Sequence, residues 1–150
     1  MNFVYTNGNN KDFIMLGQML DEYLNKIVSG EKQREKYIKY NTLDDIQDVI
    51  LIYDKDLPIG CVGFKYYDDG IAEVKRVFLQ SDYRGQGLSK ELIKLIEERA
   101  KIKGFKKMIL ETGEPLVESM GLYTKLGYRI IENYGQYKNM SESICMSKEI

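Results

Sequence analysis

Hydrophobic residues recur along the chain with two different periods, which predict a mixture of helices and strands. After Asn10, apolar side chains return every three or four residues, as on one face of an amphipathic helix: Phe13, Leu16, Leu20, Leu24 and Ile27. A second apolar stripe predicts a helix over 88–102, which ends at Lys103-Gly104. Two further helices are predicted, a polar one over 31–40 and one that begins at Gly113-Glu114-Pro115 and ends near Gly127.

Short apolar runs between turn residues predict seven strands. They cover 3–6, 49–53, 59–67, 71–79, 107–112, 128–132 and 143–147. Asp54-Lys55-Asp56 and Asp68-Asp69-Gly70 are typical of tight turns between strands, and 133–140 is predicted to be a loop. Helices and strands alternate along the whole chain without a linker, so we expect one mixed α/β sheet in a single domain over 1–150.

Histidine is absent from the chain. This excludes Ser-His-Asp and Cys-His nucleophile systems, zinc bound by histidine and an imidazole base near neutral pH. Proton transfer would therefore fall to carboxylates, Tyr, Lys, Cys or water. Cys61 and Cys145 lie far apart, so we expect two reduced, buried cysteines and no metal.

Charge and hydropathy limit the partners. The chain has 22 basic and 23 acidic residues, which argues against a nucleic-acid partner. Its apolar runs are too short to cross a membrane, and the first residues do not resemble a secretion signal, so we expect a cytoplasmic protein. Twelve tyrosines are unusual and suit both cores and binding clefts.

A glycine-containing turn joins the strand 71–79 to the helix 88–102. Its residues Arg84, Gly85 and Gly87 allow the backbone to approach a ligand closely, and the helix N-terminus adds partial positive charge. These features suit a pyrophosphate. The alternative is an ordinary strand-to-helix turn in which glycine relieves strain.

The turn resembles the signature of the GNAT family of acetyl-CoA-dependent N-acetyltransferases, Gln/Arg-x-x-Gly-x-Gly/Ala. Here it reads Arg84-Gly85-Gln86-Gly87-Leu88-Ser89, and Gly121-Leu122-Tyr123-Thr124-Lys125-Leu126-Gly127-Tyr128 is similar to a second element of the family. Ser89 and Leu116 depart from the family pattern, which has Gly or Ala and often Asn at these positions. The resemblance implies a mostly antiparallel sheet of about seven strands with about four helices, and acetyl-CoA as co-substrate.

The resemblance also implies the cofactor-binding residues. The backbone of Val77, Phe78 and Leu79 would pair with the pantetheine arm, where the strands 71–79 and 107–112 diverge. Five backbone amides would hold the pyrophosphate: Gly85, Gln86, Gly87, Leu88 and Ser89. Arg84 would support this loop, and Lys125 would lie near the phosphates, unless it is simply a solvated helix residue.

Two residues are candidates for catalysis in this resemblance. Tyr123 would protonate or stabilise the departing thiolate; otherwise it is a core tyrosine. Glu73 would take the proton of the amine, directly or through water; otherwise it forms a salt bridge with Lys75 or Lys65. A two-residue period predicts that Glu73 and Val77 share one face of their strand. The backbone N–H of Phe78 or of a neighbour would polarise the thioester carbonyl.

The expected reaction is direct transfer of an acetyl group to a primary amine of a small molecule or an amino-acid-like acceptor. Tyr37, Tyr134 and Tyr137 are candidate acceptor-binding residues, since the family builds its acceptor site from the first helices and the last hairpin. A protein or peptide acetyltransferase and a non-catalytic acetyl-CoA-binding module remain alternatives. The sequence is also compatible with a homodimer.

Overall fold

The computed structural model describes residues 1–27, 46–113 and 117–150. Its centre is a seven-stranded sheet in the order β1-β2-β3-β4-β5-β7-β6. The strands are β1 (Asn2–Thr6), β2 (Asp48–Asp54), β3 (Leu57–Asp68), β4 (Ile71–Leu79), β5 (Lys107–Gly113), β6 (Arg129–Ile131) and β7 (Ser143–Glu149). Neighbouring strands are antiparallel except for β4 and β5, which are parallel. The predicted fold class is thereby confirmed.

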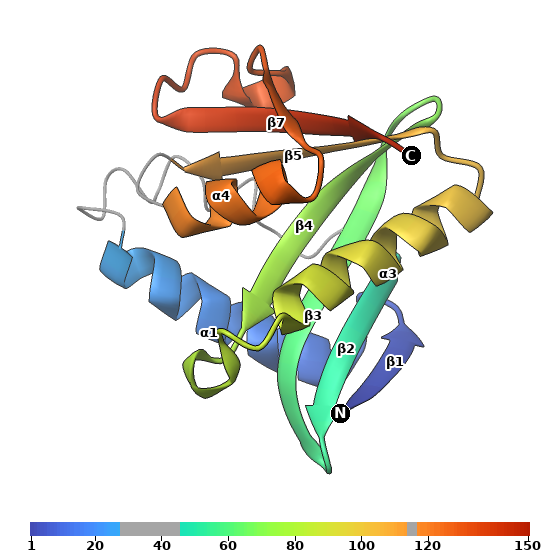
Figure 1. Ribbon diagram of the computed structural model, residues 1–150, viewed down its shortest axis with the longest axis vertical. Helices are drawn as coiled ribbons and strands as arrows, with labels where there is room; N and C mark the ends of the chain where they lie inside the picture. The colour runs from blue at the N-terminus through green and yellow to red at the C-terminus, as the bar shows by residue number, and fades with distance from the viewer. Residues whose placement is uncertain (28–45, 114–116) are drawn as a thin grey trace.

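The described residues contain three α-helices: α1 (Lys11–Ile27), α3 (Leu88–Ile102) and α4 (Val117–Lys125). Figure 1 shows α3 and α4 on one face of the sheet and α1 on the other. Four helices were expected; the polar helix predicted over 31–40, which carries Tyr37, lies outside the described residues.

Apolar side chains form separate cores on the two faces of the sheet. Under α3 and α4, the core contains Leu92, Ile93 and Ile96, which are all fully buried. Under α1 it contains Phe13 and Leu16, also fully buried. The three- and four-residue spacing seen in the sequence therefore marks the buried stripe of both helices.

The helix ends follow from local side-chain and glycine chemistry. The Asn10 side chain caps α1, because its Oδ1 accepts the backbone N–H groups of Asp12 at 2.8 Å and Phe13 at 3.1 Å. Gly104 ends α3 with φ of +94°, and Gly127 follows α4 with φ of +100°. Both are left-handed conformations that favour glycine.

An irregularity in β4 changes the orientation of its second half. Against β3, Cys61 pairs with Phe78 and Gly63 with Lys75, so β4 contains one additional residue over this stretch. Arg76 lies in this bulge with φ of +57°. Consequently Val77 packs against the core under α3 and α4, whereas Glu73 faces the opposite side. The prediction that the two share a face was wrong, because the bulge interrupts the two-residue period.

Candidate active site

The parallel pair β4–β5 comes apart directly after Glu73. The last paired residues are Glu73 and Ile109, although β4 continues to Leu79 and β5 to Gly113. In Figure 1 the two strands diverge from this point, and α4 lies in front of their separated ends. We call the unpaired stretch of β4 and β5 the splay. Its strand edges carry backbone groups that pair with no strand among the described residues.

A glycine-containing loop follows β4 at the open end of the splay. Gly85 and Gly87 have φ of +83° and +79°, and a Cβ atom on either would meet nothing within 4 Å. Their conformation, rather than crowding by protein atoms, therefore calls for glycine. Gly87 precedes α3 and offers no side-chain cap, so the first N–H groups of this helix remain available to an anion.

Arg84 stabilises this loop through contacts with other parts of the chain. Its Nε donates to the Leu79 carbonyl oxygen at 3.1 Å, and its guanidinium lies 4.6 Å from the centre of the Tyr23 ring on α1. Arg84 thus connects the loop, the end of β4 and the first helix. This contact agrees with a supporting role for Arg84 in the loop.

Glu73 lies at the vertex of the splay with only 1% of its surface exposed. The Tyr134 hydroxyl donates a hydrogen bond to its Oε2 at 2.6 Å. Its Oε1 lies 4.0 Å from Lys65 Nζ and 3.9 Å from Lys75 Nζ. The salt bridges considered from the sequence are therefore both present, and they leave the carboxylate enclosed by partners of its own chain.

A short 3-10 turn, Gly135–Tyr137, follows β6 and is preceded by Tyr134. We call residues 134–137 the tyrosine turn. The rings of Tyr134 and Tyr137 meet edge to face at 5.6 Å, and Tyr67 from β3 meets Tyr134 in the same way at 5.1 Å. The Tyr137 hydroxyl accepts a hydrogen bond from Lys75 Nζ at 3.4 Å. Burial, together with the neighbouring Glu73 charge, raises the pKa of the Tyr134 hydroxyl well above its ordinary value. Tyr134 is therefore a proton donor throughout the neutral range.

Lys75 and Glu111 also belong to this group, although the sequence pattern indicates a functional role for neither. Burial lowers the pKa of Lys75, while Glu73 and Glu111 oppose the change. Burial raises the pKa of Glu111, which accepts a hydrogen bond from Ser143. The alternation along β4 and β5 indicates which residues of one strand lie on the same face. It does not indicate which residues of different strands the tertiary structure brings together.

Tyr123 lies on the other face of the sheet, on α4, with 6% of its surface exposed. Its ring meets that of Tyr128 at 5.7 Å. Burial raises the pKa of the Tyr123 hydroxyl, and the charge of Glu111 on β5 adds to the rise. The structure thus gives Tyr123 a core environment, and at the same time an electrostatic connection to the group around Glu73.

The remaining predicted residues are dispersed. Phe78 buries its side chain under α1, Val77 and Leu79 face α3, and Lys125 is exposed at the end of α4. Leu116 lies outside the described residues. Over 1–27, 46–113 and 117–150, no three Cys, Asp or Glu side chains are grouped as metal ligands would be.

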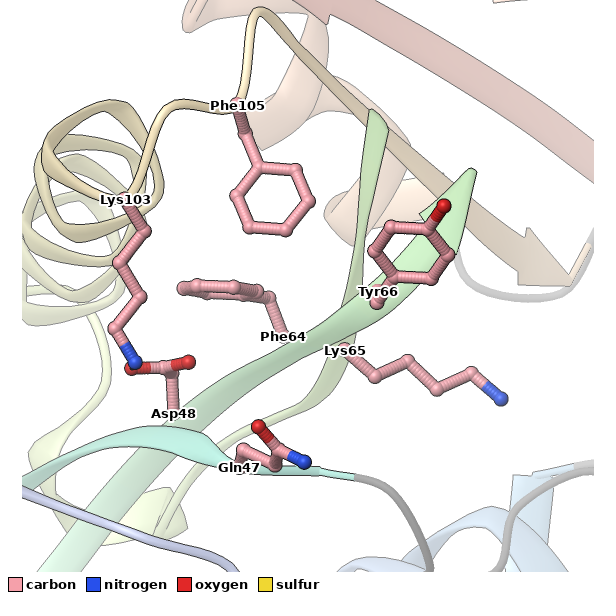
Figure 2. A pocket seen from close by; sticks show the side chains of 7 residues that line it. All are labelled: Gln47, Asp48, Phe64, Lys65, Tyr66, Lys103 and Phe105. Carbon is pink, nitrogen blue, oxygen red and sulfur yellow. The ribbon is translucent and has the colours of Figure 1, made fainter. Parts of the chain in front are cut away.

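A separate pocket of about 470 Å³ lies at the far end of β3, beside the C-terminal end of α3. Figure 2 shows the rings of Phe64 and Phe105 at its centre and Lys103 pointing to Asp48, at 2.6 Å. Tyr66 borders it, while Lys65 extends away from the rings. The glycine loop follows the opposite end of β4, so this pocket is not part of the splay.

None of the helices in the described parts of the chain is long and apolar enough to cross a membrane. Both cysteines are free and buried, as expected.

The chain matches a family model described as the acetyltransferase (GNAT) family over residues 16–128. IAA acetyltransferase of Azospirillum brasilense is 27% identical over 138 residues, covering 91% of this chain and 90% of that protein. Several other curated relatives are longer, and the chain spans only 31% to 52% of their length.

Two solved structures show the same fold. The putative acyl-CoA N-acyltransferase from Klebsiella pneumoniae has a TM-score of 0.80 at 23% identity, with 99% of this chain and 96% of that chain covered. PaiA N-acetyltransferase from Thermoplasma acidophilum, solved in complex with coenzyme A, has a TM-score of 0.74 at 20% identity over the full length of both chains. Because the family model matches most of the sequence and confirms the resemblance of its two motifs, the chain belongs to the GNAT acetyltransferase family.

Proposed function

We propose that this protein is an acetyl-CoA-dependent N-acetyltransferase that transfers an acetyl group directly to a primary amine of a small-molecule acceptor. The observation that carries the proposal is the splay itself. β4 and β5 separate immediately after a buried carboxylate, and the glycine loop and the N-terminus of α3 follow at the open end. A pantetheine arm and a pyrophosphate need these two features in this order.

The residues present fit acetyl-CoA. Gly85 and Gly87 leave open space around the N–H groups that would hold the pyrophosphate, from Gly85 to Ser89. When bound, acetyl-CoA supplies an activated acetyl thioester. The coenzyme A complex of the Thermoplasma acidophilum neighbour supports the same ligand here.

Backbone alternation favours Val77 over Phe78 as the hydrogen-bonding partner of the arm. Gln80 donates its N–H to Ile59 on β3, so Gln80 and Phe78 direct their backbone groups to β3. Val77 and Leu79 direct theirs to the splay, where Arg84 already takes the Leu79 carbonyl. We therefore expect the backbone N–H of Val77, rather than that of Phe78, to polarise the thioester carbonyl.

Proton handling is divided between the two faces of the sheet. Glu73, on the face of the tyrosine turn, would take the proton that the amine loses. Tyr123, on the α4 face, keeps its proton at neutral pH because burial raises its pKa, and it can donate to the departing thiolate. Lys125 is exposed at the end of the Tyr123 helix, and its role near the phosphates stays a prediction.

A small acceptor is favoured over a peptide because the tyrosine turn covers Glu73. Tyr134 and Tyr137 lie over Glu73 and Lys75, and Tyr67 closes against Tyr134. An amine on a slender chain fits beside these rings more readily than an extended backbone.

The test is release of free thiol from acetyl-CoA in the presence of single amines, after acetyl-CoA binding is established by thermal shift. The panel contains phenethylamine, ethanolamine, spermidine, glucosamine and amino-acid methyl esters, with peptides bearing a free N-terminus as a second arm. We expect release with at least one small amine and slower release with every peptide. Faster release with peptides would favour the peptide alternative, and binding without release would favour the non-catalytic module.

A further inference from the structure

The Tyr134 hydroxyl covers one oxygen of the buried Glu73 carboxylate. Glu73 is 1% exposed, whereas Tyr134, which donates to Oε2 at 2.6 Å, is only partly buried. The other carboxylate oxygen, Oε1, faces Lys65 and Lys75 at about 4 Å. Tyr134 is thus the more accessible member of the pair, and its hydroxyl is the group through which a proton could reach Glu73 Oε2.

We propose that the Tyr134 hydroxyl is a catalytic group that relays the proton of the acceptor amine to Glu73. This inference rests on the proposed function. The acceptor starts as an ammonium ion. One of its N–H bonds breaks as that proton passes to Tyr134 Oη, while the hydroxyl proton of Tyr134 passes to Glu73 Oε2. Tyr134 ends neutral, Glu73 ends protonated, and the amine keeps the electron pair that attacks the acetyl carbonyl.

Both transfers occur together, because a tyrosinate here would be unstable. Burial and the Glu73 charge raise the pKa of Tyr134, so its hydroxyl gives up one proton only as it receives another. The titratable groups around the relay come from four strands and the tyrosine turn. They are Lys65 and Tyr67 on β3, Lys75 on β4, Glu111 on β5, Cys145 on β7, and Tyr137 in the turn. The two lysines stabilise the carboxylate before transfer.

Several independent contacts hold Tyr134 in the relay position. Asn133 Nδ2 donates to the carbonyl oxygens of Tyr137 at 3.1 Å and Met140 at 3.0 Å, which fixes the turn. Gly135 has φ of +51°, and a Cβ atom there would lie 3.1 Å from the Tyr67 hydroxyl. The Tyr134 backbone also hydrogen-bonds to the Cys145 thiol. This positioning keeps the reorganisation before proton transfer small.

The hydrogen bond can be tested without any substrate. In protein labelled with 13C at tyrosine Cζ, the Tyr134 signal is identified by its loss in Tyr134→Phe. We expect Glu73→Gln to shift this signal, because the amide no longer accepts as a carboxylate does. A Tyr134 signal that does not move in Glu73→Gln would overturn the relay.

Kinetics of the same variants test the proton path, with the panel amine that the wild type accepts best. We expect Tyr134→Phe and Glu73→Gln each to lower kcat about 100-fold at pH 7, and the double variant to lose no more than either alone. The loss should shrink as the pH approaches the acceptor's own pKa, because a neutral amine has no proton to give up before attack. Tyr53→Phe, which removes a hydroxyl bonded to Asp12 outside the site, is the matched control and should keep kcat.

Other results separate the relay from the broader proposal. If the wild type acetylates an amine and Tyr134→Phe keeps full kcat, the relay is wrong and the proposed function stands. A loss in Tyr134→Phe that is equal at every pH indicates a merely structural role and also overturns the relay. If no amine is accepted, the proposed function fails, and the NMR arm still decides whether the hydrogen bond exists.

Discussion

Glu73 and Tyr123 are both buried, and burial affects their chemistry in different ways. A buried carboxylate is costly unless it is paired, and Glu73 is paired with two lysines and a tyrosine hydroxyl. A buried tyrosine hydroxyl instead retains its proton, since burial raises its pKa. Burial therefore makes Glu73 depend on its partners, whereas it keeps Tyr123 in the form that can donate a proton.

Replacing Tyr123 with Phe tests the donor. We expect kcat to fall about 100-fold with little change in KM, because the hydroxyl serves the departing thiolate and the ring keeps its packing. Thiol-release kinetics measure both parameters. Urea denaturation should show that the free energy of unfolding changes by less than about 1 kcal/mol. Unaltered kcat would identify Tyr123 as a core residue only.

At the scale of secondary-structure elements, the glycine loop and the N-terminus of α3 are the proposed phosphate end of the site. Gly87 and Gly104 stand before and after the same helix, both with positive φ and both with open space where a Cβ atom would lie. Only the first of them borders the splay. The same substitution at the two positions therefore separates the loss of stability caused by backbone strain from the loss of acetyl-CoA binding.

We expect Gly87→Ala and Gly104→Ala each to reduce the free energy of unfolding by about 1–2 kcal/mol, since alanine is strained at positive φ. Only Gly87→Ala should weaken acetyl-CoA binding, by about tenfold, because it alone distorts the N–H groups proposed to hold the pyrophosphate. Urea denaturation and isothermal titration calorimetry measure the two effects. Equal acetyl-CoA affinity in both variants would argue against the phosphate assignment.

The sequence predicts the elements better than the contacts between them. The spacing of Phe13, Leu16 and Leu20 identifies the buried face of α1, since helix periodicity is local. The face of Val77 was mispredicted because the bulge at Arg76 depends on tertiary contacts. Arg76 donates there to Asp21 at 3.0 Å and to the Gly17 carbonyl on α1. Such long-range contacts have no periodic signal.

The candidate site shows the same limit. Glu73 and Tyr134 were each singled out from the sequence, but they are 61 residues apart and nothing in their local patterns pairs them. Glu111 and Lys75 were given no functional role, because a charged strand residue is ordinarily solvated. Sheet topology, in which β5 lies between β4 and β7, brings these residues together.

At the scale of the whole molecule, the sheet separates two working faces. α3 and α4 cover one face and α1 lies on the other (Figure 1). The tyrosine turn meets Glu73, which faces away from the core under α3 and α4. In the proposed reaction, the splay lets Glu73 and Tyr123, which lie on different faces of the sheet, act on one bond. With this arrangement the proposed direct transfer needs no histidine, which the chain lacks.

Many hydroxyl and thiol groups are buried, so the folded protein should be sensitive to alkali. Burial raises the pKa of Cys61 from 9.0 to about 12 and that of Cys145 from 9.0 to about 11. Burial and Asp12 raise the pKa of Tyr53 from 10.0 to about 12. Above pH 9 the unfolded chain releases protons that the folded chain retains. The contribution of these groups to the free energy of unfolding is therefore complete below pH 9 and is lost as the pH rises.

We expect the free energy of unfolding to drop by about 2 kcal/mol or more between pH 9 and pH 11, as measured by urea denaturation at fixed ionic strength. Cys61→Ala should show a smaller drop, because one of the retained protons is gone. A free energy of unfolding that is constant from pH 8 to pH 11 would contradict these raised pKa values.

The central claim is that the protein moves an acetyl group from acetyl-CoA to an amine. The most direct measurement quantifies free thiol and acetylated amine in the same reaction, the first by a thiol reagent and the second by mass spectrometry. The account predicts one acetylated amine for each thiol released, and a strong reduction of both in Tyr123→Phe. Thiol release without acetylated amine, or no release with any amine although acetyl-CoA binds, would contradict it.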